Sequence, residues 1–291
     1  MDTTEDTSND KKKDHKSDPA LSAEQKNKAK NIQKGLSEKF IPDEIMDVLL
    51  EEVSSTRTVD TQTYIAETRA RVWKALKIGL QFEATTQKSE RFLRKHVNSK
   101  RKLIILYADL VGSTRMSQTL PVGRLATIIQ TFTQEMSFAI SNFDGYVLKY
   151  VGDAVIAYFP AEQNFYLACD AAINCASSMI TMLQQGINPV LNQYDYTDLQ
   201  VKIGIDAGDH AIIQYGRDEK SHVDILGYSI SIASKITALA QPNQVVVSGT
   251  VYNGIHPSLR KKFSELELDR NVWNYIDENT GEIYRLYAFN G

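Results

Sequence analysis

Apolar residues between positions 103 and 159 occur in two distinct patterns. Short, mostly apolar runs at about 103–109, 146–151 and 154–159 have the length and composition of buried strands. Between the first two runs, the stretch from Pro121 to about Asn142 has apolar side chains every three or four residues, which predicts a long helix. Its apolar face consists of Leu125, Ile128, Ile129, Phe132, Met136, Ala139, Ile140 and Phe143. A strand, a helix and a hairpin therefore follow one another.

The same alternation continues toward the C-terminus. The pattern predicts a helix at about 162–185, a Pro/Asn/Tyr/Asp-rich insert at about 187–198, strands at 199–206 and 210–215, a helix at about 228–240, and strands at 244–248 and near 283–289. The order β-α-β-β-α-β with extra strands is the ferredoxin-like plan of an α+β domain. We therefore expect residues 99–291 to form one such domain.

The first part of the chain has a different composition. Residues 1–22 are polar and contain almost no large apolar side chain, so we expect a disordered tail there. Residues 23–98 follow a helical pattern. One stripe of this segment carries Ile65, Val72, Leu76 and Leu80, whereas Glu67, Arg69, Arg71 and Lys74 lie mostly off it. The segment is either a dimerising or signal-coupling helix or a helical cap packed on the following domain.

Composition and charge exclude several classes of protein. The 291 residues are 42% apolar with a net charge of −3, which is enough for a substantial core and leaves no electrostatic footprint for nucleic acid. No apolar run approaches the roughly 20 residues of a membrane span, and the N-terminus lacks the apolar core of a signal peptide. Cys169 and Cys175 fall inside a helical pattern and are expected to be buried thiols. We therefore expect a cytoplasmic protein with neither a nucleic-acid nor a membrane partner.

Two aspartates stand at the edges of predicted strands, where their chemistry is unusual. Asp109 follows the first apolar run and Asp153 precedes the third, 44 residues later. A carboxylate beside a buried strand is costly to desolvate unless it is paired, hydrogen-bonded or bound to a cation. Two carboxylates on neighbouring strands would hold Mg²⁺, and the turn Gly112-Ser113-Thr114 offers backbone N–H groups to an anion. Each feature alone is a common turn, but together they predict metal-assisted chemistry on a nucleoside triphosphate.

Histidines add no further candidate to this site. His210, His222 and His256 are dispersed and show no metal-ligand spacing, so we expect them on the surface or in loops.

Four segments, in order and with suitable gaps, resemble the class III nucleotidyl cyclases. They are YADLVGST at 107–114, LKYVGD at 148–153, VKIGIDAG at 201–208 and DILGYSISIASK at 224–235. The resemblance covers roughly residues 100–290. It implies the ferredoxin-like cyclase fold and a homodimer in which the metal-binding aspartates of one subunit face the base-reading residues of the other. Each monomer would then carry two incomplete half-sites.

The same resemblance implies roles for the residues that bind metal and phosphate. Asp109 and Asp153 would hold two Mg²⁺ or Mn²⁺ ions, with the backbone carbonyl of Leu110 as an additional ligand, so no dedicated protein base is required. Amides of Val111, Gly112, Ser113 and Thr114 would bind the β- and γ-phosphates. Lys202 stands where the family usually has a basic phosphate contact.

Base specificity is implied by two further positions. Lys149 would donate to adenine N1 and Asp224 would accept from the N6 amine, which matches ATP and mismatches GTP. Ser231 and Lys235 stand where many members carry an Asn and an Arg that stabilise the transition state. This departure implies slow turnover, because lysine lacks the planar fork of arginine. Tyr107 stands where Phe is frequent, and it would place a hydroxyl near the base.

The resulting expectation is a homodimeric adenylyl cyclase that converts ATP to 3′,5′-cyclic AMP and pyrophosphate. A cyclase for a pyrimidine or guanine nucleotide is the alternative within the same chemistry, because Tyr107, Ser231 and Lys235 depart from the usual pattern. A catalytically silent nucleotide-binding module that signals by dimerising is the alternative from another class. Retention of both Asp109 and Asp153 argues against the silent module.

Overall fold

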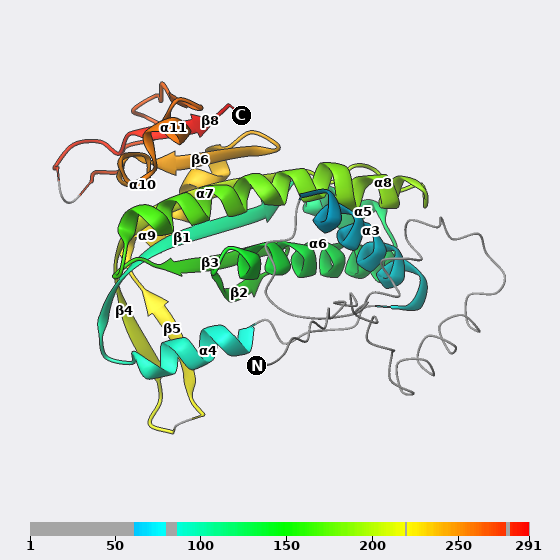
Figure 1. The fold of residues 1–291 in the computed structure, drawn as a ribbon, viewed down its shortest axis with the longest axis horizontal. Coiled ribbons are helices and arrows are strands. Elements are labelled where there is room, and N and C mark those ends of the chain that lie inside the picture. Colours follow the sequence, from blue (N-terminus) through cyan, green and yellow to red (C-terminus); the bar gives the residue numbers. More distant parts are fainter. Residues whose placement is uncertain (1–60, 80–85, 219, 278–279, 291) are drawn as a thin grey trace, which may run out of the picture. The chain divides into compact units, whose positions relative to one another are not determined.

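The computed structural model describes residues 61–79, 86–218, 220–277 and 280–290 (Figure 1). The predicted tail at residues 1–22 and the helical pattern at 23–60 lie outside the described residues. The expected N-terminal helices are therefore represented by α3 (Thr61–Ile78) and α4 (Thr86–Lys95).

An eight-stranded mixed sheet forms the centre of the described chain. Its order is β2-β3-β1-β4-β6-β8-β7, and β5 pairs with β4 off this path. The strands are β1 (Lys100–Leu110), β2 (Tyr146–Val151), β3 (Ala154–Pro160), β4 (Val201–Tyr215), β5 (His222–Leu226), β6 (Gln244–Ser248), β7 (Phe263–Glu265) and β8 (Leu286–Phe289). Neighbours pair antiparallel except for β4 and β6, which are parallel. The predicted α+β plan is confirmed.

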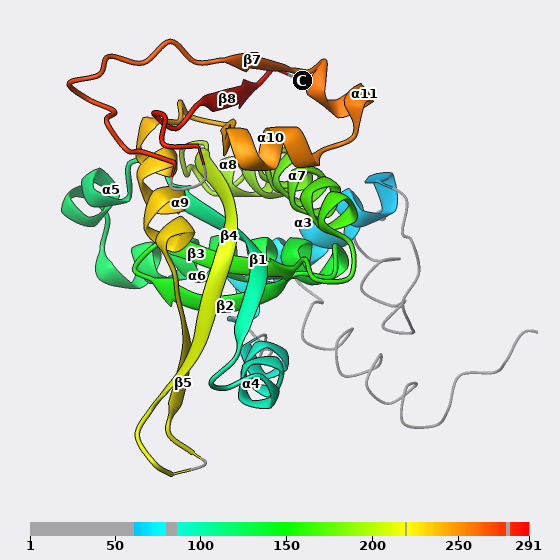
Figure 2. The ribbon, with the colours of Figure 1, turned by 90° about the vertical axis from the view of Figure 1, so that its left-hand side faces the viewer.

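Helices cover both faces of this sheet. Leu103 and Ile105 of β1 pack in one cluster with Leu93 of α4, so α4 lies on their side of the sheet. Helix α9 (Tyr228–Leu239) contributes Ala233 to the same cluster. Because side chains alternate along a strand, Ile104 of β1 points to the opposite face. Helices α6 (Val122–Asn142) and α7 (Phe165–Thr181) cover that face, and Figure 2 shows α7 and α9 on opposite sides of β1 and β4.

β4 is one continuous strand, which corrects the prediction of two strands at 199–206 and 210–215. The Gly208-Asp209 pair reads as a turn in the sequence, yet both residues pair with β1 opposite Leu103 and Lys102. The glycines of β4 serve instead to bring α9 close. A Cβ at Gly204 would lie 2.5 Å from the Ala233 carbonyl oxygen of α9. Close packing against α9 therefore explains why β4 contains glycines, which usually mark turns.

The helix after β3 is longer than predicted. It continues beyond α7 through the π-helix η1 (Met182–Ile187) and α8 (Asn188–Asn192), so the insert expected at 187–198 is partly helical. Pro189 is tolerated because it lies in the first turn of α8, where its missing N–H is not needed. The run Phe165–Asn192 is long and apolar enough to cross a membrane, but half of its most apolar window is buried in the domain. Cys169 and Cys175 lie there as buried free thiols, as predicted.

Several short elements have no clear signal in the sequence. Strands β5 and β7 and the helices α5 (Ser113–Thr119), α10 (Gly249–Gly254) and α11 (Pro257–Arg260) are three to seven residues long. Patterns of this length cannot be told from loops by periodicity. The predicted C-terminal strand is confirmed in a shorter form, as β8.

His210 is not the surface or loop residue that was expected. It lies in β4, its side chain is 1% exposed, and its Nε2 is 2.7 Å from the Ser229 hydroxyl of α9. Burial lowers the pKa of this imidazole to about 4. His210 therefore serves as a neutral packing residue between β4 and α9.

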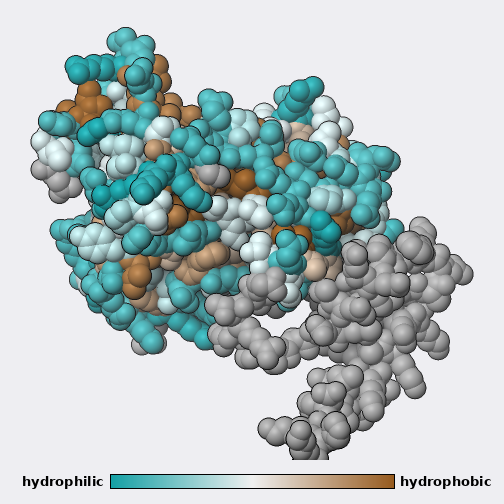
Figure 3. All heavy atoms as spheres, turned by 45° about the horizontal axis from the view of Figure 1, so that its top comes forward, coloured by the Kyte–Doolittle hydropathy of each residue, from teal (hydrophilic) through white to brown (hydrophobic). Residues whose placement is uncertain are grey.

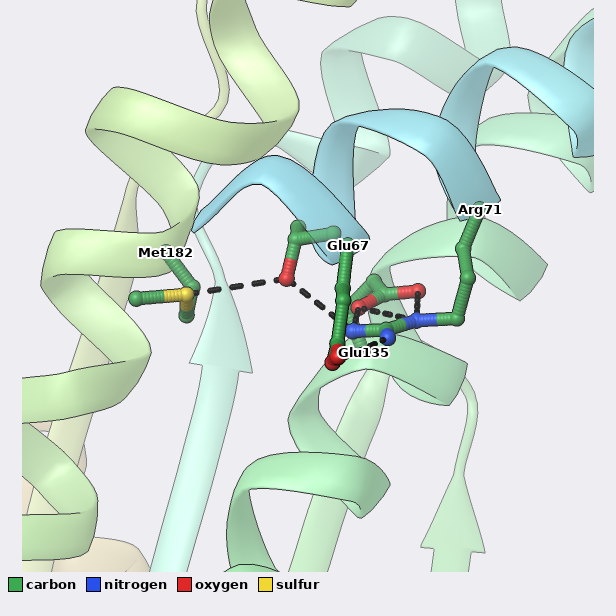
Figure 4. Close-up of polar contacts among 5 residues, drawn as sticks. Glu67, Arg71, Glu135 and Met182 are labelled. Carbon is green, nitrogen blue, oxygen red and sulfur yellow. Dashed lines mark hydrogen bonds and ion pairs between the residues drawn. The ribbon is translucent and has the colours of Figure 1, made fainter. Parts of the chain in front are cut away.

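Helix α3 is held against α6 by a buried ion pair (Figure 4). The Arg71 guanidinium makes a bidentate contact with Glu135, with Nη2–Oε2 at 2.7 Å and Nε–Oε1 at 3.0 Å. Arg71 Nη2 also donates to Thr68, whose hydroxyl lies 3.6 Å from the Met182 sulfur in η1. Glu135 is 3% exposed, so this contact lies inside the packing. Arg71, expected mostly off the apolar stripe, therefore fastens α3 as a helical cap on the following domain.

The surface shows hydrophobic residues scattered among hydrophilic ones on the face drawn in Figure 3. Exposed large apolar side chains include Tyr166, Leu167 and Val272. Single exposed apolar side chains are normal for globular proteins and require no partner.

Candidate active site

Asp109 and Asp153 come together at one end of the sheet. Asp109 lies near the end of β1. Asp153 lies directly after Gly152, in the two-residue turn that joins β2 to β3. Because β1 and β3 are paired up to Ala108 and Val155, the two aspartates occupy adjacent positions. The sheet thus brings together the two carboxylates that the sequence places 44 residues apart.

The charges of these two carboxylates act on each other. Burial raises the pKa of Asp109, the negative charge of Asp153 raises it further, and Lys202 opposes both effects. Lys202 lies directly opposite Asp109 on β4. The pKa of Tyr107 is also raised, first by burial and then by both aspartates. Such a pair of carboxylates is the environment that a divalent cation neutralises.

The oxygen atoms of Asp109, Asp153 and the Leu110 carbonyl fit a hard divalent cation that also binds phosphate oxygens. Within the described residues no group of three His, Cys, Asp or Glu side chains could hold a metal. Two carboxylates with the Leu110 carbonyl would leave positions open for water and phosphate oxygens, which is how Mg²⁺ is usually bound at phosphate sites.

The predicted phosphate loop is a turn that leads from Leu110 into α5, and one of its four amides is already bound. Gly112 adopts the left-handed conformation with φ 77°, which favours glycine, and α5 then begins at Ser113. The Val111 amide instead donates to the Gln200 carbonyl at 2.8 Å. This corrects the expectation for Val111, whose amide is already bound, and leaves Gly112, Ser113 and Thr114 as the predicted phosphate contacts.

Lys149 and Asp224 form a direct ion pair. Lys149 Nζ of β2 lies 2.5 Å from Asp224 Oδ2 of β5, and the Ile225 amide donates to Oδ1 at 2.9 Å. The Asp224 side chain is 14% exposed and that of Lys149 is 36% exposed, so the pair is reachable from solvent. The sequence predicted that these two residues would read one base, and the structure brings them into contact.

A cavity of about 420 Å³ lies beside this ion pair, between α4, β2 and β5. Its lining includes Leu93 of α4, Lys149 and Tyr150 of β2, and His222 of β5. The His222 Nε2 lies 4.0 Å from Asp224 Oδ2. His222 is exposed, as predicted, and the pairing of β5 with β4 places it on one strand with Asp224. The volume is within the usual range for small-molecule sites.

Ser231 and Lys235 lie one turn apart on the exposed side of α9. The side chains between them, Ile232 and Ala233, are buried. The Lys235 ammonium lies 5.7 Å from the centre of the Tyr275 ring. Both predicted residues thus face away from the core of their own chain, where another subunit could be reached.

This fold and these paired carboxylates define a protein of the nucleotide cyclase class. The family model of the adenylate and guanylate cyclase catalytic domain matches residues 96–271. The chain belongs to this family.

Similar proteins differ in the nucleotide that their names state. A cytidylate cyclase from Escherichia coli is 23% identical over 201 residues, which is 65% of this chain and 43% of that protein. A uridylate cyclase from Rhodovulum sp. (strain MB263) is 25% identical over 189 residues, covering 62% of this chain and 77% of that protein. The structure of the adenylyl cyclase CyaB from P. aeruginosa aligns with a TM-score of 0.53 at 20% identity, over 66% of this chain and 94% of that one. The chain thus spans less than half of its E. coli relative, and the structural likeness shows the fold.

Proposed function

We propose that the chain is a homodimeric cyclase for a nucleoside triphosphate whose base presents an exocyclic amine beside an unprotonated ring nitrogen on its Watson–Crick edge. The reaction would convert this triphosphate into the 3′,5′-cyclic nucleotide and pyrophosphate. The observation that carries the choice of base is the contact between Lys149 and Asp224.

The Lys149–Asp224 pair offers one donor and one acceptor to the edge of a base. Lysine has three N–H donors and a carboxylate has two acceptor oxygens, so both groups retain capacity beyond their own contact. Adenine and cytosine each present a ring nitrogen acceptor beside an amine donor. Guanine and uracil present the opposite order, and they would leave buried polar groups unpaired. ATP and CTP are therefore preferred over GTP and UTP.

CTP ranks ahead of ATP among these two substrates. The sequence pattern alone favours ATP, but a cytosine satisfies the same ion pair. The name of the E. coli relative, cytidylate cyclase, favours CTP. Ser231 and Lys235 also replace the usual Asn and Arg, as they would in a pocket adapted to another base. Uracil presents a ring N–H beside a carbonyl, which the ion pair disfavours, so the relative named uridylate cyclase does not change this order.

The residues of the two half-sites would divide the work of the reaction. When bound, two divalent ions would lower the pKa of the ribose 3′-hydroxyl and neutralise the triphosphate. Asp109, Asp153 and the Leu110 carbonyl would hold these ions. The amides at 112–114 and the Lys202 ammonium would orient the phosphates for in-line displacement of pyrophosphate. Ser231 and Lys235 of the partner subunit would approach the ribose and the charge that develops at the α-phosphorus.

Turnover of each of the four ribonucleoside triphosphates with Mn²⁺, followed by mass spectrometry of the products, tests the proposal. We expect cyclic CMP to form fastest, cyclic AMP next, and little product from GTP or UTP. Asp109→Asn and Asp153→Asn should each abolish turnover while far-UV circular dichroism stays unchanged, because an amide cannot replace a charged metal ligand. Asp144→Asn, at a turn position with φ 58° that asparagine tolerates, is the matched control. Substantial activity in either metal-site variant would contradict the assignment.

A further inference from the structure

Strand β2 contains one residue more than its pairing with β3 requires. Val147 lies opposite Ala157, but the next paired position puts Lys149 opposite Ile156. Leu148 is therefore the extra residue of a β-bulge. Bulges re-aim side chains and occur often beside active sites.

This bulge decides which face of the sheet carries Lys149. Ile156 belongs to the cluster under α4, whereas its neighbour Val155 points to the opposite face, which α6 and α7 cover. In an unshifted register Lys149 would lie opposite Val155 and point toward that opposite face. With the bulge, Lys149 shares the face of Ile156 and reaches Asp224.

A hydrogen bond to α6 fixes the strand directly after the bulge. The Tyr150 hydroxyl lies 2.8 Å from the hydroxyl of Ser137, which is fully buried in α6. Ser137 donates its single hydrogen to the Thr133 carbonyl at 2.7 Å, so the Tyr150 hydroxyl is the donor to Ser137. Tyr150 lies opposite Val155, on the face that α6 covers. In the unshifted register the two side chains would exchange faces, and Tyr150 would point away from Ser137.

We propose that Ser137 and Tyr150 are positioning residues for the Lys149–Asp224 pair. Their hydrogen bond holds β2 in the bulged register, and this register aims the Lys149 ammonium at Asp224. The consequence for substrate choice rests on the proposed function. The geometry itself does not, and it can be measured without turnover.

Chemical labelling of lysines tests the geometry. Acetic anhydride acetylates neutral amines, so an ammonium held in an ion pair reacts slowly, and peptide mass spectrometry gives the rate at each lysine. We expect Tyr150→Phe and Ser137→Ala to speed acetylation of Lys149 about 3- to 10-fold, the effect of one hydrogen bond. Asp224→Asn gives the rate for an unpaired Lys149. Tyr146→Phe is the matched control, since Tyr146 lies on the same strand but stacks on Tyr158 on the α4 face, away from Ser137.

Substrate discrimination tests the consequence. Tyr150→Phe should lower the ratio of kcat/KM for CTP to that for UTP about 3- to 10-fold. This loss should disappear in a Lys149→Ala background, because Tyr150 acts through Lys149. A loss of equal size in that background, or unchanged labelling of Lys149 in Tyr150→Phe, overturns the positioning role. A wild-type protein that turns over none of the four triphosphates overturns the proposed function instead, and labelling still decides the role of Tyr150.

Discussion

Asp206 is a buried carboxyl that the proposed chemistry does not use. It lies in β4 opposite Ile105, its side chain is 0% exposed, and neither oxygen has a hydrogen bond of acceptable geometry in the described part of the chain. Burial raises its pKa to about 7, and the nearby Ser248 hydroxyl offsets only part of this effect. Asp206 therefore binds a proton in the folded state at pH values where the unfolded chain does not.

The raised pKa of Asp206 predicts that the protein loses stability as pH rises. Its folded pKa lies above its unfolded value, so the stability that the bound proton contributes is fully present below about pH 4. This contribution, roughly 2–4 kcal/mol, is lost as pH rises through about pH 7. Asp206→Asn should remove this slope and stabilise the protein at pH 8, as urea unfolding between pH 5 and 8 would show. Asp209→Asn, an exposed carboxylate paired with Lys100, is the control and should leave the slope in place. Equal slopes in wild type and Asp206→Asn would contradict this assignment.

Individual residues of the site differ in how far their surroundings follow from sequence. Asp109 and Asp153 lie in short motifs whose strand edges are visible locally, and the sheet brings them together as the metal interpretation requires. The Val111 amide donates its hydrogen bond to the carbonyl of Gln200, which is distant in sequence. The burial of His210 depends likewise on the packing of α9. Local pattern predicts where a side chain is, but not which distant group approaches it.

At the scale of elements, the long helix α6 and the hairpin strands match their predicted bounds because periodicity and turn residues agree there. The continuous strand β4 does not, because Gly208-Asp209 has the local chemistry of a turn and only its partner β1 keeps it extended. The bulge at Leu148 is equally invisible in one sequence, since register is a property of two strands. Long-range pairing therefore accounts for the main errors.

The buried ion pair between Arg71 and Glu135 predicts that the loss of the Arg71 charge strongly weakens the packing of α3 on α6. Arg71→Met leaves Glu135 buried without its partner, and this should lower the free energy of unfolding by about 3 kcal/mol. The double variant Arg71→Met/Glu135→Met should recover most of the loss, because two apolar side chains can pack where the ion pair lay. Chemical denaturation followed by tryptophan fluorescence suits the measurement, since Trp73 is buried in α3.

The second partner of Arg71 supplies the control for this cycle. Glu67 lies 3.6 Å from the guanidinium with a side chain that is 38% exposed, so Glu67→Gln should cost less than about 1 kcal/mol. If Glu67→Gln costs as much as Arg71→Met, the stability resides in the helix α3 itself and not in its clamp to α6.

At the scale of the whole molecule, one chain presents two groups of site residues. The charges that act on Asp109 are those of Asp153 and Lys202, whereas Lys149 is paired with Asp224. Ser231 and Lys235 occupy the exposed side of α9. In the proposed homodimer, the first group of one subunit faces the second group and α9 of the other, and two-fold symmetry creates two equal sites.

Mixing an inactive variant with a weakly active one tests this sharing. Asp109→Ala lacks the metal ligand and Lys149→Ala lacks the base contact, so each homodimer has two defective sites. A heterodimer combines Asp109 of one subunit with Lys149 of the other in one intact site, while its second site carries both substitutions. Random exchange makes half of the dimers mixed, so activity should return to about a quarter of the wild-type value, a consequence of two-fold symmetry. Subunit exchange is followed independently by native mass spectrometry of differently tagged chains. Mixed dimers that form without regaining turnover would show that each site is built within one chain.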